Sequence, residues 1–261
     1  MDFSFSVFRR LLRTLMQCGY EPCTVARACS AGAPAGRHFI LRHDIDRREH
    51  KAALIAALEH GEGVAGTYYF RHLGGFNADV IRRVAELGHE IGYHYENLSA
   101  CLGDVSAAME DFRGMLAAIR KIAAVRTIAM HGAPLSAYDN RDLWRDHDFR
   151  AFDVDAEAYL SIDFSRYRYL TDTGRRWDAA ATNLRDRATS AAGGDPKPLP
   201  RGTHDLMREI ASGAFDRYYV TCHPERWADG HLEWACILGK DAMINLAKRC
   251  IGIVRAAREG R

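Results

Sequence analysis

Short β-rich apolar runs alternate with helical segments through the first half of the chain. The predicted strands are 39–42, 65–70, 90–94 and 127–130, and the predicted helices between them cover about 49–60, 78–87 and 105–121. Strands that alternate with helices of this length indicate parallel βαβ units. We therefore expect an α/β fold, and favour an irregular (β/α) barrel with mainly parallel strands over an open sheet.

The remaining segments are predicted from spacing and composition. Residues 3–19 carry apolar side chains at helical spacing, which predicts an amphipathic helix that caps a barrel end. A Gly/Ala-rich connector runs on to Gly36. The Gly- and Pro-rich stretch 188–203 is predicted to be a surface loop, and 237–258 an outer helix. We expect one domain over residues 1–261.

Composition and charge exclude several classes of protein. A chain of 261 residues, 48% hydrophobic and 27% charged, can bury a large core. A net charge of +2 without long basic runs gives no support to a nucleic-acid partner. We expect no transmembrane segment, because no apolar run is long enough to span a bilayer. Seven cysteines without a CxxC pair, and no signal peptide, predict reduced thiols and a location in the cytoplasm or loosely at the inner face of a membrane.

The segment 42–46 places two carboxylates two residues apart, directly after a predicted strand. Because side chains alternate along a strand, Asp44 and Asp46 point to one side while His43 and Ile45 point to the other. Two like charges in one small site repel unless a cation or a shared proton offsets them. This arrangement predicts a bound metal ion.

Three further polar clusters follow predicted strands. They are His94 with Glu96, His131 with Gly132, and His223 with Pro224 and Glu225. The carboxyl ends of barrel strands converge on one face, where reactive groups collect. Three histidines and two aspartates there form a candidate site for a divalent metal ion with an open position for water.

Several ordered motifs resemble one known family. The stretch 88–94, Gly-His-Glu-Ile-Gly-Tyr-His, resembles the second motif of the polysaccharide deacetylases, carbohydrate esterase family four, also called the NodB-homology family. Segment 42–46 stands where that family has its two-aspartate motif. Segment 220–224 resembles the strand that delivers a catalytic histidine, and 170–177 resembles the aspartate-tryptophan motif. The match extends over most of the chain. The chain resembles a divergent intracellular branch of this family, of the kind linked to bacterial surface-polysaccharide (O-antigen/LPS) biosynthesis.

The chain departs from that family pattern at three places. Ile45 separates two aspartates that are usually adjacent, so the division between base and ligand stays open. Leu98 stands where a second metal-binding histidine is expected, and His131 could replace it by geometry. The stretch 131–134 occupies the place of the arginine motif that usually orients the catalytic base.

The resemblance implies metal-assisted hydrolysis of the N-acetyl amide of an amino sugar. The implied metal ligands are Asp46, His94 and His131, with zinc as the favoured ion and with Glu96 or Asp44 as other candidates for the third ligand. Asp44 would take a proton, and His223 would protonate the leaving amine.

Four further residues complete the implied site. Asp172 would orient His223, although a helix N-cap or turn is an equally good use for this aspartate. Tyr138, Trp177 and Glu96 are the implied substrate contacts, with core packing as the competing use of the aromatic residues.

Two alternatives stay open, one from the same class and one from a different class. One is another metal-dependent hydrolase of non-peptide C–N bonds on the same scaffold, because fold and metal do not fix the substrate. The other is a catalytically degenerate protein that only binds carbohydrate, prompted by Leu98 and the missing arginine motif.

Overall fold

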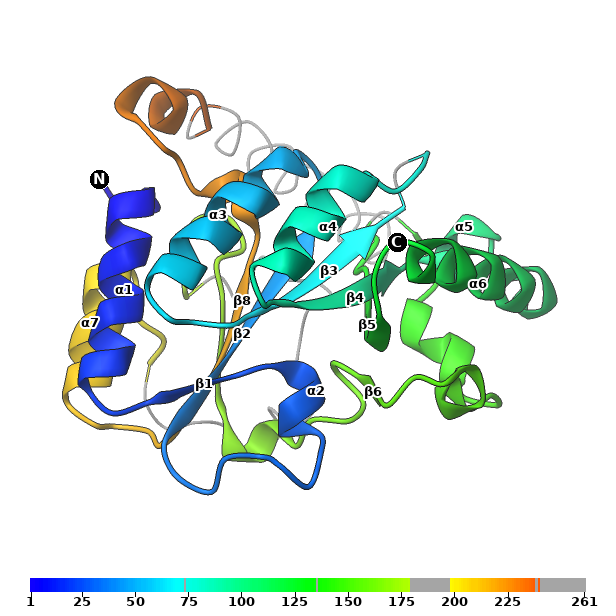
Figure 1. Cartoon of the computed structure of the whole chain (residues 1–261), viewed down its shortest axis with the longest axis horizontal. Helices are drawn as coiled ribbons and strands as arrows, with labels where there is room; N and C mark the ends of the chain where they lie inside the picture. Colours follow the sequence, from blue (N-terminus) through cyan, green and yellow to red (C-terminus); the bar gives the residue numbers. More distant parts are fainter. Residues whose placement is uncertain (73, 135, 179–197, 238, 240–261) are drawn as a thin grey trace, which may run out of the picture.

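The chain folds around one parallel β-sheet with helices packed against it (Figure 1). The structure is a computed structural model and describes residues 1–72, 74–134, 136–178, 198–237 and 239. Its strands are β1 (Glu21–Cys23), β2 (His38–Ile45), β3 (Thr67–Arg71), β4 (Glu90–Tyr95), β5 (Val125–Met130), β6 (Ala156–Glu157), β7 (Arg168–Thr171) and β8 (Arg217–Cys222).

The helices of the described residues are mostly connections between these strands. The α-helices are α1 (Phe5–Gln17), α2 (Val25–Ala28), α3 (His50–Gly61), α4 (Ala78–Glu86), α5 (Asn97–Ala100), α6 (Val105–Arg120) and α7 (Thr203–Ala211). The 3-10 turns are η1 (Asn140–Trp144), η2 (Phe149–Phe152), η3 (Phe164–Arg166) and η6 (Pro224–Arg226). The predicted alternation of strands and helices is confirmed.

The sheet is an incomplete barrel. Its strand order is β6-β5-β4-β3-β2-β8-β7, with β1 paired to the start of β2, and every pairing is parallel. The sheet curves strongly. The Arg42 guanidinium on β2 lies 4.3 Å from the ring centre of Tyr159, which follows the edge strand β6, although β3, β4 and β5 lie between the two strands in the sheet. Within the described residues, β6 and β7 do not pair to close the barrel. The predicted class, α/β with an irregular, mainly parallel barrel, is confirmed.

Strand β2 is central and buried along its whole length. Phe39 and Leu41 point outward and pack in the apolar cluster formed with α1 and α7. Arg42 and Asp44 have the opposite parity and point into the barrel. A strand of this kind is covered on both faces, so its inward polar groups must find partners inside the protein.

Helix α1 differs from its predicted position. Ser4 caps its start by accepting a hydrogen bond from the Val7 N–H, and the chain leaves it through Gly19 at φ +78°. Its buried side chains pack with Leu41 and Val220, which lie on the outer faces of β2 and β8. The helix therefore covers the outside of the sheet, and the prediction that it caps a barrel end is wrong.

The connector before β2 also contains structure that its composition did not predict. Residues 21–23 form β1, and residues 25–28 form the single-turn helix α2. A strand of three residues with Pro22 at its centre has too little alternation to be recognised in the sequence.

Two predicted segments cannot be compared in full. Most of the loop 188–203 and nearly all of the helix 237–258 lie outside the described residues. The residues after that loop form α7 and β8. No helix in the described part of the chain has the length and apolar character needed to cross a bilayer.

Candidate active site

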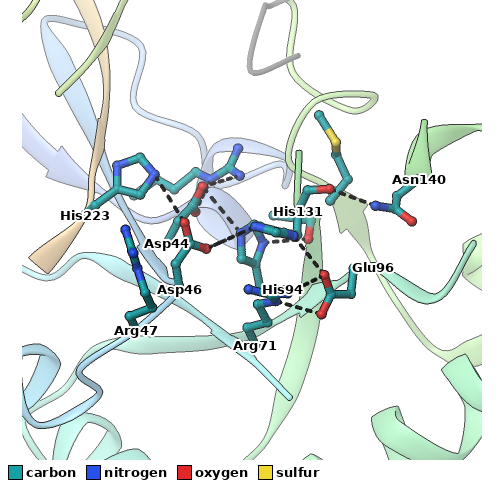
Figure 2. Close-up of polar contacts among 12 residues, drawn as sticks. Asp44, Asp46, Arg47, Arg71, His94, Glu96, His131, Asn140 and His223 are labelled. Atoms are coloured by element: carbon teal, nitrogen blue, oxygen red, sulfur yellow. Dashed lines mark hydrogen bonds and ion pairs between the residues drawn. The ribbon is translucent and has the colours of Figure 1, made fainter. Parts of the chain in front are cut away.

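The carboxyl ends of four parallel strands bring together five residues predicted from the sequence (Figure 2). Asp44 and Asp46 come from the end of β2, and one histidine comes from the end of each of three other strands: His94 from β4, His131 after β5 and His223 after β8. The neighbouring strands are in register, with His43 opposite Cys222 and His94 opposite Ala129. This register places the five side chains at one end of the barrel.

Asp46 is the centre of this cluster. Its Oδ1 lies 3.3 Å from His94 Nε2 and 3.7 Å from His131 Nε2, and its Oδ2 lies 3.9 Å from His223 Nε2. Oδ1 is buried and has no hydrogen-bond partner among the described residues. Burial opposes ionisation of Asp46, but the three histidines outweigh it and hold its pKa well below the usual range.

Each of the three histidines is oriented through its other ring nitrogen. His94 Nδ1 lies 2.9 Å from the Ala129 carbonyl oxygen, His131 Nδ1 lies 2.9 Å from Glu96 Oε2, and His223 Nδ1 lies 2.6 Å from Asp172 Oδ1. Carbonyl and ionised carboxylate oxygens only accept hydrogen bonds, so Nδ1 carries the proton in each ring. All three Nε2 atoms therefore face Asp46.

This donor set fits a divalent cation chemically. With Nδ1 donating, Nε2 is the ring atom that faces Asp46. Burial lowers the pKa of His94, but Asp44 and Asp46 outweigh it and raise it, so a positive charge is favoured at this position. A divalent cation bound by the deprotonated Nε2 would supply that charge instead. Two imidazoles and a carboxylate are ligands that zinc accepts, and Glu96 behind His131 is the outer carboxylate typical of metal-bound histidines. Among the described residues, however, no three His, Cys, Asp or Glu side chains already form a metal-holding group.

Asp44 lies beside this cluster with a different partner. Arg42 donates to both of its oxygens, from Nε to Oδ1 at 2.7 Å and from Nη2 to Oδ2 at 2.8 Å. Asp44 Oδ2 also lies 3.8 Å from His94 Nε2. Burial disfavours the charged form, but Arg42 and the nearby histidines overcome it and lower the pKa of Asp44. Asp44 is therefore ionised at neutral pH.

Arg42 was missed as a site residue in the sequence. It is fully buried inside the barrel, with its guanidinium 5.3 Å from the ring centre of Tyr69 and 4.3 Å from that of Tyr159. The signal was available, because Arg42 shares the parity of Asp44 and Asp46 on one strand.

His223 forms the most tightly bonded pair of the site. Asp172 accepts hydrogen bonds from His223 Nδ1, from the His223 backbone N–H at 2.9 Å and from Trp227 Nε1 at 2.9 Å. Burial and Arg226 lower the pKa of His223, but Asp172 and Asp46 outweigh them and raise it to about 9. The structure thus places Asp172 where the sequence predicted it, directly behind His223.

Glu96 supports His131 and has little capacity left for a substrate. Arg71 donates to both Glu96 oxygens at 2.7 Å, and Oε2 also accepts from His131. Burial opposes ionisation, yet His131 and Arg71 lower the pKa of Glu96 to about 2. The geometry places Glu96 behind a histidine and away from the open side of the cluster.

The two predicted aromatic substrate contacts have different surroundings. Tyr138 is 40% exposed, and its ring covers Gly103, whose added Cβ would lie 2.2 Å from it. Trp177 is only 1% exposed, stacks on Phe3 and donates from Nε1 to Thr203 Oγ1. The structure therefore does not bring Trp177 to the site.

Leu98, at the position of the missing histidine, is buried on the short helix α5 and packs in the apolar core. Its side chain therefore supplies no ligand. His131 faces Asp46 from the end of β5, as the replacement hypothesis requires geometrically.

The fold and the cluster together define a parallel α/β protein with a carboxylate and histidine centre at the strand ends. No protein family and no curated protein matches the chain. Among solved structures, it is similar to the Xyl-CE4 domain of a multidomain xylanase from the hindgut metagenome of Trinervitermes trinervoides, with 14% sequence identity and a TM-score of 0.37. That similarity covers 82% of this chain and 84% of the other. These values assign neither a family nor an activity to this chain.

Proposed function

We propose that this protein is a metal-dependent deacetylase that hydrolyses the N-acetyl amide of an amino sugar. The observation that supports this most is the convergence of three histidine Nε2 atoms on Asp46. His94 and His131 face its buried, unpartnered Oδ1, His223 faces its Oδ2, and a second ionised aspartate lies beside them. Asp46, His94 and His131 would hold the ion. A divalent ion in such a site supplies activation of water and polarisation of an amide carbonyl.

The residues around that centre divide the proton transfers between them. Asp44 is ionised and accepts the proton that the attacking water loses. Arg42 holds Asp44 in place and keeps it charged in a buried position. Because both oxygens of Asp44 already accept from Arg42, its position is fixed before a substrate binds.

His223 serves as the general acid. An amine leaves readily only when it is protonated, and a raised pKa keeps a proton on His223 at neutral pH. Asp172 fixes the ring, with Trp227 holding the second oxygen of the same carboxylate. Tyr138 is the exposed aromatic residue proposed to contact the sugar.

Three finer parts of the proposal concern the native ion, the biological role and the location. Zinc is proposed as the native ion because the donor set contains two imidazoles. A role in bacterial surface-polysaccharide synthesis is supported only by the resemblance of the sequence motifs. The cytoplasm is proposed as the location, and free cysteines at every described cysteine position support it.

The test is acetate release from N-acetylated amino sugars by protein that has been stripped with a chelator and reloaded with zinc. We expect release by the reloaded protein only. Asp44→Asn and His223→Ala should each lower turnover by roughly 10²- to 10⁴-fold. His147, an exposed histidine outside the cluster, provides the control variant His147→Ala with normal turnover.

Two results would contradict the proposal. One is the absence of acetate release from every N-acetylated sugar offered to the reloaded protein, which would favour the carbohydrate-binding alternative. The other is full turnover in His223→Ala, which would remove the proposed acid from the mechanism.

A further inference from the structure

A second charged pair lies at the edge of the site. Arg47 directly follows Asp46, and Glu225 lies two residues after His223. Arg47 Nη2 and Glu225 Oε1 are 4.0 Å apart, at the outer limit of an ion pair. Figure 2 draws the Arg47 guanidinium on the same side of Asp46 as His223, with no dashed line from it.

The two members of this pair differ in burial. Glu225 is 7% exposed, and neither carboxylate oxygen has a hydrogen-bond partner within the described residues. The Arg47 side chain is 62% exposed. At 4.0 Å, Glu225 is within ion-pair range of the guanidinium but accepts no hydrogen bond from it. The Arg47 guanidinium therefore lies at the edge of the site while its N–H donors stay available.

The other arginines at this end of the barrel have closer partners. Arg71 donates to both oxygens of Glu96, and Arg48 lies 3.6 Å from Glu233. Arg226 donates to the Asp172 carbonyl oxygen at 3.0 Å. Arg47 is the arginine of this group whose charge is least compensated by the protein, since Glu225 is its one ion-pair partner in the described part of the chain.

We propose that Arg47 binds an anionic group of the substrate, a carboxylate or a phosphate, on the side from which the amine leaves. The planar guanidinium donates in a fork that matches both groups. His223 acts on the leaving amine and lies on the same side of Asp46, so the anionic group belongs to the sugar part of the substrate and not to the acetyl part. This inference rests on the proposed function and narrows its substrate to an acidic N-acetylated amino sugar.

The test compares three N-acetylated substrates: neutral N-acetylglucosamine, its 1-phosphate and an N-acetylated aminouronic acid. We expect kcat/KM to be roughly 10- to 100-fold higher for at least one anionic substrate than for N-acetylglucosamine, because a pair of charge-assisted hydrogen bonds contributes about that much to binding. The two anionic substrates distinguish phosphate from carboxylate. Arg47→Gln should abolish the preference mainly through KM, and Arg47→Lys should retain part of it. Arg48→Gln is the matched control and should keep the full preference.

Binding to chelator-treated protein provides a second measurement that does not need turnover. Wild-type protein should bind the preferred anionic sugar more tightly than Arg47→Gln does, and the difference should shrink as salt is raised. Equal affinities of the two proteins, or an unchanged preference in Arg47→Gln, would overturn the inference. Failure of the wild type to release acetate from all three sugars would instead contradict the proposed deacetylase function.

Discussion

At the scale of single residues, the charge of Asp44 depends on Arg42. Both side chains are almost completely buried, and Arg42 donates two hydrogen bonds to the carboxylate from within the same strand. The Arg42 guanidinium lies over the rings of Tyr69 and Tyr159. Removing one member would leave the other as an uncompensated buried charge.

We therefore predict that Arg42→Gln lowers the free energy of unfolding by about 3–5 kcal/mol, as loss of one partner of a buried ion pair does. Chemical denaturation at neutral pH measures this. Arg47→Gln, at an exposed arginine on the same segment, should change it by only about 0.5 kcal/mol. A small effect of Arg42→Gln would mean that Asp44 has another partner.

A second residue-scale prediction concerns the pKa of His223. Burial and Arg226 favour the neutral ring, and Asp172 with Asp46 favours the charged one, giving a pKa of about 9. Because this exceeds the unfolded value of about 6.5, the stabilisation from His223 is complete below pH 6.5 and is lost as pH rises through 9. In Asp172→Asn the pKa should fall, and the loss of stability between pH 6.5 and 9 should become smaller.

NMR titration of the His223 ring in chelator-treated protein measures this pKa directly. The same sample of Asp172→Asn serves as the comparison. An identical pKa in both proteins would show that Asp172 does not control the protonation of His223.

For single residues, the alternation of side chains along a strand decided which positions could be predicted from the sequence. Asp44 and Asp46 were predicted to share a side because they are two residues apart, and they do. Arg42 obeys the same rule but was not considered, because an arginine inside a barrel is rare without a partner. Trp177 shows the opposite problem: a motif places a residue in sequence, but only packing decides whether it reaches the site.

At the scale of elements, the position of the Tyr69 ring of β3 over β4 depends on Gly92. A Cβ added at Gly92 would lie 2.3 Å from the Tyr69 ring and 3.0 Å from the Thr127 carbonyl oxygen. Tyr69 cannot move aside easily, because its hydroxyl donates to Thr127 Oγ1 at 3.0 Å and its ring flanks Arg42. Gly92 thus leaves room inside the barrel for the Tyr69 ring of the neighbouring strand β3.

We predict that Gly92→Ala lowers the free energy of unfolding by about 1–3 kcal/mol, through overpacking of the barrel interior. Gly114→Ala is the matched control, because Gly114 lies on an exposed position of α6 with no atom within 4 Å of an added Cβ. That variant should stabilise by about 0.5–1 kcal/mol through helix propensity. Equal effects of the two variants would contradict the packing argument.

Helices long enough to show a hydrophobic periodicity were predicted well, and very short elements were not. The helices 49–60, 78–87 and 105–121 agree with α3, α4 and α6 to within a residue or two, because each carries enough turns to show its period. Strand β1 and the single-turn helix α2 are too short for that. Alternation also cannot show which side of the sheet a helix covers, which is why α1 was placed at a barrel end.

At the scale of the whole molecule, the cysteines test the proposed cytoplasmic location. The six cysteines at described positions, 18, 23, 29, 101, 222 and 236, are free. Burial raises the pKa of Cys23 to about 11 and of Cys29 to about 12, and it also raises the pKa of Cys222 well above the usual value for a thiol. These three thiols should be unreactive at neutral pH while the protein is folded.

Thiol titration should therefore show one pattern in the native protein and another after denaturation. In the folded protein, the exposed Cys236 should react before Cys23, Cys29 and Cys222. After denaturation without reductant, all seven cysteines should react. Two or more stable disulfides would count against the cytoplasm.

The central claim concerns one ion held by residues from three strands. Its most direct test is the metal content of purified protein, measured by elemental analysis after dialysis against zinc and removal of unbound metal. The account predicts about one ion per chain in the wild type and in His223→Ala, and loss of that ion in Asp46→Ala and His94→Ala. No bound ion in the wild type, or full occupancy in Asp46→Ala and His94→Ala, would contradict it.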